Sequence, residues 1–366
     1  MKKCFFAYSN TPFKVNEPIS DAVRIINKSG TIHIDTWEAL NIDGNIIIDE
    51  ILERIMQSDI FICELSSFNL NVLFELGYAI AKKKKIKIFL NLSLADVENK
   101  FNNLNILSSI AYTNYINSNN LQTEIWKIIE DDTEDILSKT IANKSRFSNC
   151  HELFYMKNLY DTDESIILSR TIEELKIKLI VDDPNEVSIQ PLEWYFQILL
   201  NCNGVITHLL SDQYVNAKIY NQKASFIAGI AYGLDIPLLM VVGAPFTVPM
   251  DYRNIIKIYN RKNDCIEFVN NWFEKYKDSI KADNKSTQYT QQELKAFSDL
   301  HSIDLGESLA ENEQEKILNY FVKTSSYNDA LNRNLSIFIG RKGTGKTANL
   351  VNLAEEFKNK KTTFVL

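Results

Sequence analysis

The sequence has few of the residues that build metal sites and disulfide frameworks. Its 366 residues include five cysteines and four histidines. No two cysteines have Cys-x-x-Cys spacing, and the histidines are isolated from one another. Neither a zinc site nor a set of disulfides is therefore expected. A reducing cytoplasm is the simplest setting, because disulfide-bonded proteins concentrate in oxidising compartments.

Long hydrophobic runs are also missing. No apolar stretch reaches the roughly 18 residues that a membrane-spanning helix needs. The apolar run at 4–8 is too short for a signal peptide and is ended by Ser9-Asn10-Thr11-Pro12. An excess of positive charge is missing too, since the net charge is -7. This balance does not favour nonspecific nucleic-acid binding. We expect a cytoplasmic protein with neither a membrane nor nucleic acid as a direct partner.

Strand-like and helix-like segments alternate over the first 280 residues. In the first half, strands are predicted at 4–8, 31–35, 59–65, 86–90 and 110–115, and helices at 21–28, 46–56, 71–82 and 121–129. In the second half, strands are predicted at 153–156, 178–182, 204–210, 237–242 and 255–259, and helices at 164–175, 192–200, 223–234 and 265–276. Such alternation predicts parallel sheets covered by helices on both faces. We predict two tandem flavodoxin-like α/β domains, at 1–135 and 150–280.

The second domain repeats the pattern of the first. Phe74-Glu75-Leu76-Gly77 aligns with Phe226-Ile227-Ala228-Gly229, and each half ends in an amphipathic helix that contains tryptophan. This indicates a tandem duplication. On that alignment the second copy has lost the carboxylate, because Ile227 stands where the first copy has Glu75. The second copy is then a scaffold, a dimer interface or a binding domain without chemistry.

The last part of the chain carries a phosphate-binding motif. A polar stretch near 277–291 predicts a linker, and amphipathic patterns extend it to a helical linker over 281–330. Residues 340–347 then match Gly-x-x-x-x-Gly-Lys-Thr, after a predicted strand and before a predicted helix. Its glycines expose backbone N–H groups to phosphates, while Lys346 reaches the outer phosphates and Thr347 holds Mg²⁺. The nucleotide-binding residues of this motif are Gly340, Gly343, Gly345, Lys346 and Thr347.

Residues 331–366 are accordingly predicted to begin a P-loop NTPase domain that takes ATP and Mg²⁺ as cofactors. The chain ends before a Walker B acid, so we expect this domain to be cut short. The segment resembles P-loop ATPases of the STAND and AAA-like kind.

Glu75 is the candidate catalytic residue. It lies in an otherwise apolar helix opening, after a buried strand and a polar loop, and buried glutamates are rare. Ligands of open α/β sheets bind at the carboxyl ends of the strands. An ionised carboxylate beneath a ribose C1′ stabilises an oxocarbenium-like transition state or traps it covalently. With nicotinamide as the leaving group no general acid is needed, whereas an ordinary base as the leaving group makes a second acid desirable.

The segment from Asn69 to Ala79 resembles the Asn-x-Asn-Val-x-Phe-Glu-Leu-Gly-Tyr-Ala signature of bacterial TIR-like and nucleoside 2-deoxyribosyltransferase-like proteins. Phe5-Phe6-Ala7-Tyr8-Ser9 is similar to the first strand of TIR domains. The resemblance covers roughly residues 1–130, and the second copy more weakly. It implies that Glu75 is the catalytic carboxylate. One departure is Cys63-Glu64-Leu65, where this group usually has Ala-Asp-Leu.

The resemblance implies an enzyme that cleaves NAD between nicotinamide and ribose. Joined to a STAND-type ATPase, such a domain resembles bacterial immune effectors that deplete NAD when a phage is sensed. A homo-oligomer gated through the P-loop domain is then expected, with NAD or a related nucleotide as the substrate. The residues expected to line the substrate pocket are Tyr8, Ser9, Trp37, Glu64, Ser66, Phe68 and Asn71.

Three alternatives remain open from the sequence. A nucleoside 2-deoxyribosyltransferase would exchange bases and usually stands as a single free domain. A nucleotide sensor would bind without cleaving, a role that suits the second copy. An oligomerising adaptor would have no chemistry, and the full motif around Glu75 counts against it.

Overall fold

The computed structural model describes residues 2–39, 47–104, 106–107, 110–130, 152–185, 190–249, 253–281 and 353. Contacts divide the chain into two units, Met1–Ser286 and Thr287–Leu366. Residues 277–281 of the polar stretch predicted as a linker are helical, because the last helix runs to Lys281. The rest of the predicted linker, the P-loop residues and the Mg²⁺ ligand Thr347 lie outside the described residues, so these stay predictions. Both sheets belong to the first unit.

The first domain is built on a five-stranded sheet in which every neighbouring pair is parallel. Its strands are β1 (Lys2–Ala7), β2 (Ile32–Thr36), β3 (Ile60–Glu64), β4 (Lys85–Asn91) and β5 (Thr113–Tyr115). Its helical segments are α1 (Phe13–Lys28), η1 (Trp37–Ala39), α2 (Ile47–Gln57), α3 (Leu70–Ala81), α4 (Val97–Asn103) and α5 (Ser118–Glu130). The strand order is β2-β1-β3-β4-β5, which is the order of flavodoxin-like sheets.

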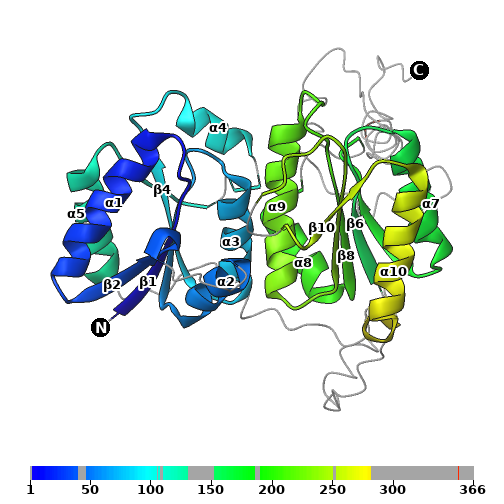
Figure 1. Cartoon of the computed structure of the whole chain (residues 1–366), viewed down its shortest axis with the longest axis horizontal. Coiled ribbons are helices and arrows are strands. Elements are labelled where there is room, and N and C mark those ends of the chain that lie inside the picture. Colours follow the sequence, from blue (N-terminus) through cyan, green and yellow to red (C-terminus); the bar gives the residue numbers. More distant parts are fainter. Residues whose placement is uncertain are drawn as a thin grey trace. The chain divides into compact units, whose positions relative to one another are not determined.

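The second domain has the same plan (Figure 1). Its strands are β6 (Glu152–Met156), β7 (Lys178–Asp182), β8 (Gly204–Leu209), β9 (Leu238–Gly243) and β10 (Ile256–Tyr259). Its helices are α7 (Asp163–Glu174), α8 (Leu192–Asn201), α9 (Ala217–Gly233) and α10 (Lys262–Lys281). The order β7-β6-β8-β9-β10 repeats that of the first sheet strand for strand. The prediction of two tandem parallel-sheet α/β domains is confirmed.

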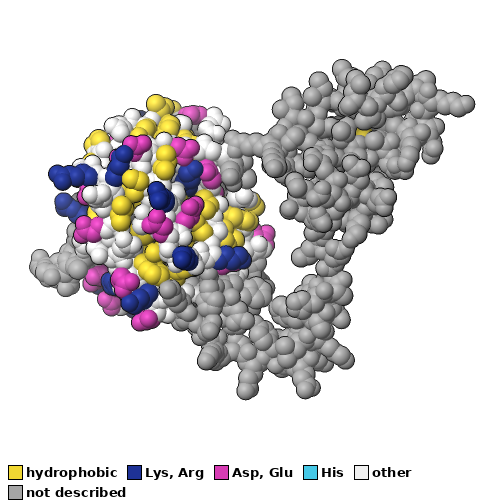
Figure 2. All heavy atoms as spheres, turned by 90° about the vertical axis from the view of Figure 1, so that its right-hand side faces the viewer, with side chains coloured by type: hydrophobic (Ala, Val, Ile, Leu, Met, Phe, Trp, Pro, Cys, Tyr) yellow, Lys and Arg dark blue, Asp and Glu magenta, His cyan; other side chains and the backbone are white. Residues whose placement is uncertain are grey.

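Burial explains why the central strands read as continuous apolar runs. All five residues of β3 and all six of β8 are buried, as expected for strands covered by helices on both faces. On the outer surface of the second domain, basic and acidic side chains are interspersed with hydrophobic ones (Figure 2).

Helix α1 shows where the sequence was misleading. It was predicted to begin at Asp21 but begins at Phe13, although Pro18 lies inside it. A proline removes the hydrogen bond to the carbonyl four residues earlier. Here the side-chain amide of Asn91 donates a hydrogen bond to that carbonyl, which belongs to Lys14, at 2.9 Å. A partner distant in sequence therefore makes the early start possible.

Other elements also differ from the prediction. Helix α9 begins at Ala217 rather than Lys223, and α4 was not predicted at all. Polar residues in both segments obscure the helical pattern, and burial of Val97 and Phe101 holds α4 against the domain.

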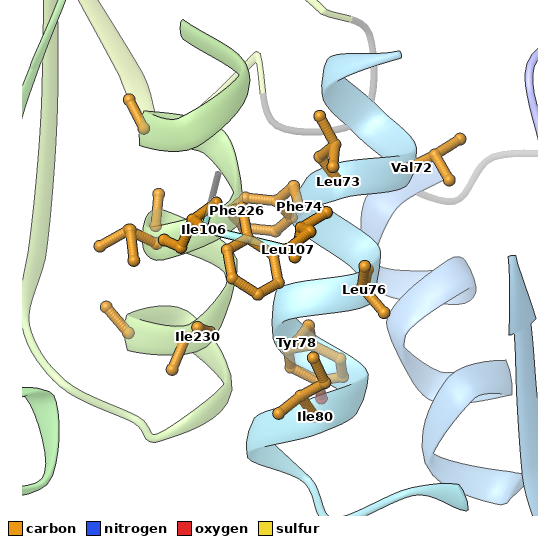
Figure 3. Close-up of a cluster of buried hydrophobic side chains, with 14 of the residues drawn as sticks. Val72, Leu73, Phe74, Leu76, Tyr78, Ile80, Ile106, Leu107, Phe226 and Ile230 are labelled. Atoms are coloured by element: carbon orange, nitrogen blue, oxygen red, sulfur yellow. The ribbon is translucent and has the colours of Figure 1, made fainter. Parts of the chain in front are cut away.

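Helices α3 and α9 join the two domains and lie side by side (Figure 3). A Cβ atom on Gly77 would clash with the carbonyl oxygen of Phe226, and one on Gly229 would clash with that of Phe74. Glycine is required here because the two backbones touch. Phe74 and Phe226 occupy equivalent places in the two copies, as do Gly77 and Gly229. The contact is therefore reciprocal, as in a two-fold dimer.

Candidate active site and second-domain crevice

The candidate site lies at the carboxyl edge of the first sheet. Strand pairing sets Phe6 opposite Thr36 and Ala7 opposite Cys63, so β1, β2 and β3 end at the same level. The residues that follow these ends are consequently neighbours across the edge. This is where open α/β sheets bind their ligands.

Glu75 is buried, with 5% of its surface exposed, and is the sixth residue of α3. The helix begins at Leu70, and Asn69 caps it by accepting a hydrogen bond from the Asn71 amide at 2.8 Å. Glu75 thus lies in the second turn, deeper than the sequence indicated, where the helix dipole favours its anion less.

The carboxylate of Glu75 lies close enough to the end of β3 for its charge to affect the pKa of the Cys63 thiol. Burial, and then the charges of Glu64 and Glu75, raise the pKa of the Cys63 thiol well above its usual range. The corresponding residue of the second copy, Ile227, is fully buried. The same helical position thus holds an acid in one domain and a hydrocarbon in the other.

Ser9 connects two of the loops at this edge. Its hydroxyl donates a hydrogen bond to the Thr11 carbonyl at 2.8 Å and accepts one from the side-chain amide of Asn69 at 3.3 Å. The loop after β1 is in this way tied to the cap of the helix that carries Glu75. Asn69 is a member of the site that the sequence indicated only as a cap.

Tyr8 and Trp37 form an aromatic pair over the ends of β1 and β2, with ring centroids 6.4 Å apart. Burial, and then the charge of Glu38, raise the pKa of Tyr8 to about 12. The tyrosine is therefore a neutral hydroxyl at physiological pH. The indole nitrogen of Trp37 is buried without a hydrogen-bond partner among the described residues.

Glu64 and Ser66 face the interior of the first domain. Glu64 has no exposed surface, and its Oε1 accepts from the Ser66 amide at 3.1 Å. Burial raises its pKa to about 7, and hydrogen bonding to Ser66 acts in the opposite direction. The Ser66 hydroxyl in turn accepts a hydrogen bond from the backbone N–H of Asn91 at 2.6 Å. Burial therefore favours the protonated form of Glu64.

Phe68 and Asn71 frame the start of α3. Phe68 is buried and has φ of 51°, a left-handed conformation that is unusual for a bulky residue. Its carbonyl accepts a hydrogen bond from Gln222 of the second domain at 3.0 Å. The Oδ1 atom of Asn71 is buried with no partner in the described part of the chain.

A cavity of about 500 Å³ opens where the loops after β3 and β8 meet. Phe68, Asn69, Tyr214, Lys218 and Gln222 are among its lining residues. Of the predicted site residues, it is Phe68 that the structure brings to this cavity. The other predicted site residues do not line this cavity. Tyr8, Ser9, Trp37, Glu64 and Ser66 lie at or just after the ends of β1, β2 and β3, whereas Asn71 and Glu75 lie within α3.

The second domain has its own crevice at the same edge, about 240 Å³ in volume. No sequence motif marks its lining residues, among them Asn158 and Tyr259. The available signal is their position on strands that are equivalent in the two domains. By strand register, the buried His208 of β8 corresponds to Glu64 of β3, and Tyr259 corresponds to Tyr115.

No group of histidines, cysteines and acids in the described ranges is arranged to hold a metal ion. Within the same ranges, no helix combines the length and apolar character needed to cross a membrane. The chain matches no protein-family model and no curated protein.

Proposed function

We propose that the first domain hydrolyses the bond between nicotinamide and ribose in NAD, with Glu75 as the catalytic carboxylate. The observation that carries this proposal is the contrast between Glu75 and Ile227. Both are buried on equivalent helices of one duplicated fold. Because the fold accepts a hydrocarbon at this position, a purely structural need for the acid is a poor explanation.

The chemistry suits a single carboxylate. When the bond between C1′ and the pyridinium nitrogen breaks, the electron pair leaves with nicotinamide, which departs as a neutral base. The positive charge that develops on the ribose ring is stabilised by the Glu75 anion. Water then adds its oxygen to C1′ and releases a proton, giving ADP-ribose. The loop tied down by Ser9 and Asn69 would hold the start of α3 in place during this step.

We further propose that the protein acts as a homo-oligomeric anti-phage effector, gated by ATP and Mg²⁺ at the P-loop. Support for this part comes from two resemblances in the sequence. Residues 1–130 resemble TIR-like proteins, and the motif around Lys346 resembles STAND and AAA-like ATPases. In cells carrying the protein, phage infection should then lower the NAD pool. That loss should be absent with Glu75→Gln, and a Lys346→Ala protein should no longer respond to ATP.

A nucleoside 2-deoxyribosyltransferase is the second candidate. It needs an acid to protonate the departing base, and Glu64 has a pKa of about 7. Against it, Glu64 has no exposed surface and is oriented toward the Ser66 amide. A substrate would have to displace that hydrogen bond before Glu64 could donate a proton to it.

The decisive experiment measures nicotinamide release from NAD by the purified protein beside Glu75→Gln. We expect release to fall by at least a hundredfold in the variant, since the charge of the carboxylate is lost while its shape is kept. The matched control is Glu53→Gln, which removes an exposed carboxylate of the same domain. Equal activity in all three proteins would contradict the proposal. Base exchange between nucleosides, with NAD left intact, would favour the second candidate.

A further inference from the structure

The crevice of the second domain lies where a parallel sheet binds small molecules. Asn158 follows β6, Ser211 follows β8, and Gly243 and Tyr259 end β9 and β10. Strands β6 and β8 are the neighbours from which the strand order runs in opposite directions. Loops separate at such a switch point and leave room for a ligand.

A buried histidine fixes two of the lining side chains. His208 has no exposed surface, and its Nε2 lies 2.8 Å from the Tyr259 hydroxyl and 3.2 Å from the Asn158 amide nitrogen. The amide nitrogen can only donate, so Nε2 is the acceptor and Nδ1 carries the proton toward the Tyr155 hydroxyl at 3.4 Å. Burial lowers the pKa of His208 to about 3, which keeps this neutral form.

Each fixed side chain keeps hydrogen-bonding capacity for a ligand. The Asn158 oxygen accepts from the Tyr160 amide at 3.1 Å, which confirms the orientation of its amide group. One Asn158 N–H and the acceptor lone pairs of Tyr259 are then not used by His208. Such preorganised groups recognise a ligand without having to be ordered on binding.

The lining excludes some ligand classes. The lining is mostly a set of hydroxyl, amide and small apolar side chains, among them Thr162, Ser211, Gln213 and Asn260. This set has no lysine or arginine to neutralise a phosphate, and its charged member is Glu164. A carboxylate among neutral amides and hydroxyls is suited to accept hydrogen bonds from sugar hydroxyls, as in dinucleotide sites.

Size narrows the class further. The crevice is smaller than the roughly 300–1,000 Å³ of pockets for drug-sized molecules. Tyr214 forms one wall and is itself held by stacking on Tyr160, with ring centroids 4.5 Å apart. A five-membered sugar ring with its hydroxyls matches this small, polar and partly aromatic space.

We propose that the second domain binds the unphosphorylated ribose ring of a nucleoside in this crevice, with Asn158, Tyr259 and Glu164 as its recognition groups. Binding here does not depend on Glu75, so it is separable from the activity proposed for the first domain. Tyr214 also lines the 500 Å³ cavity. It therefore forms a common wall between the crevice and this cavity, which Phe68 of the loop before α3 also lines.

The test is calorimetric titration of the whole chain with adenosine, D-ribose, adenine and AMP. We expect adenosine to bind one site per chain, D-ribose to bind more weakly, and AMP to bind more weakly than adenosine. Tyr259→Phe and Glu164→Gln should each weaken adenosine binding about tenfold or more, since the first removes a hydroxyl and the second replaces a charged acceptor oxygen with an N–H donor. The matched control is Tyr276→Phe, which changes a tyrosine of α10 outside the crevice.

Several results would overturn the proposal. Adenine that binds as well as adenosine would exclude sugar recognition, and AMP that binds more tightly would point to a phosphate site. Absence of binding by adenosine and D-ribose at millimolar concentration would exclude the site. Because Tyr259→Phe also removes a partner of His208, Glu164→Gln serves as the variant that leaves the interior intact. Binding that is lost in Glu75→Gln but kept in Glu164→Gln would place the ligand in the first domain.

Discussion

Gln222 of the second domain donates a hydrogen bond of 3.0 Å to the carbonyl oxygen of Phe68, the left-handed residue in the loop of the first domain. Both side chains are buried. A strained conformation persists where the surroundings stabilise it, and here part of that support comes from the other copy of the fold. The candidate catalytic loop is therefore not the product of its own domain alone.

Replacing Gln222 with alanine should loosen the loop. The Phe68 carbonyl would lose its buried partner, at a cost of about 1–3 kcal/mol in the free energy of unfolding. We also expect the variant to bind NAD more weakly. Asn69 and the start of α3, the helix that carries Glu75, directly follow Phe68 in the chain and would be held less firmly. Urea unfolding and nicotinamide release measure the two effects. Gln57→Ala, an exposed glutamine, should change neither, and a Gln222→Ala protein as stable as wild type would contradict the role given to this bond.

Gly229→Ala should separate the two helices that join the domains. The added methyl group would collide with the backbone of Phe74, and overpacking of this kind costs about 1–3 kcal/mol or more. Gly30→Ala is the matched comparison, because Gly30 has open space around it but φ of 71°, a conformation that costs about 1–2 kcal/mol for other residues. We expect the larger loss of urea stability at Gly229. A smaller loss there would mean that the helices move apart easily.

Glu64 should make the folded state less stable as pH rises. Burial raises its pKa from 4.5 to about 7, so between these values the folded state binds more protons than the unfolded state. Stability attributable to this group then falls with pH across that window and reaches a loss of about 3 kcal/mol above pH 7. Glu64→Gln should be more stable than wild type at pH 8, with a smaller advantage at pH 5. Urea unfolding at both values, beside Glu53→Gln, measures this, and an advantage that does not grow with pH would contradict it.

His208 should remain neutral in mildly acidic solution. Its pKa is lowered from 6.5 to about 3 by burial, so the folded state resists protonation while the unfolded chain accepts it. Stability attributable to this group is complete above pH 6.5 and falls as pH is lowered toward 3. Nitrogen NMR of the imidazole at pH 5 should show a neutral ring with the proton on Nδ1. A doubly protonated ring, or a proton on Nε2, would contradict the hydrogen bonds assigned to Tyr259 and Asn158.

The sequence was most informative where local signals agree with the fold. Helix α3 was predicted at 71–82 and lies at Leu70–Ala81, because Asn69 is a capping residue and the apolar pattern is dense. The flavodoxin-like class predicted for both domains implies the strand order that each sheet has, whereas the residue-by-residue register was not predicted. The start of α1 depends on Asn91, and the chemistry of His208 depends on strands β6 and β10. Contacts of this kind join residues that are far apart in the chain, so no local pattern reveals them.

The reciprocal glycine contact between α3 and α9 also has a historical meaning. A single-copy ancestor that packed as a homodimer through this helix would have placed Gly77 against its own partner in the same way. Joining two such genes makes the pairing permanent and removes the need for the halves to be identical. After such a fusion, one half would be free to lose the acid while the other keeps it. The helix face that an isolated domain would offer for self-association is therefore already buried within one molecule.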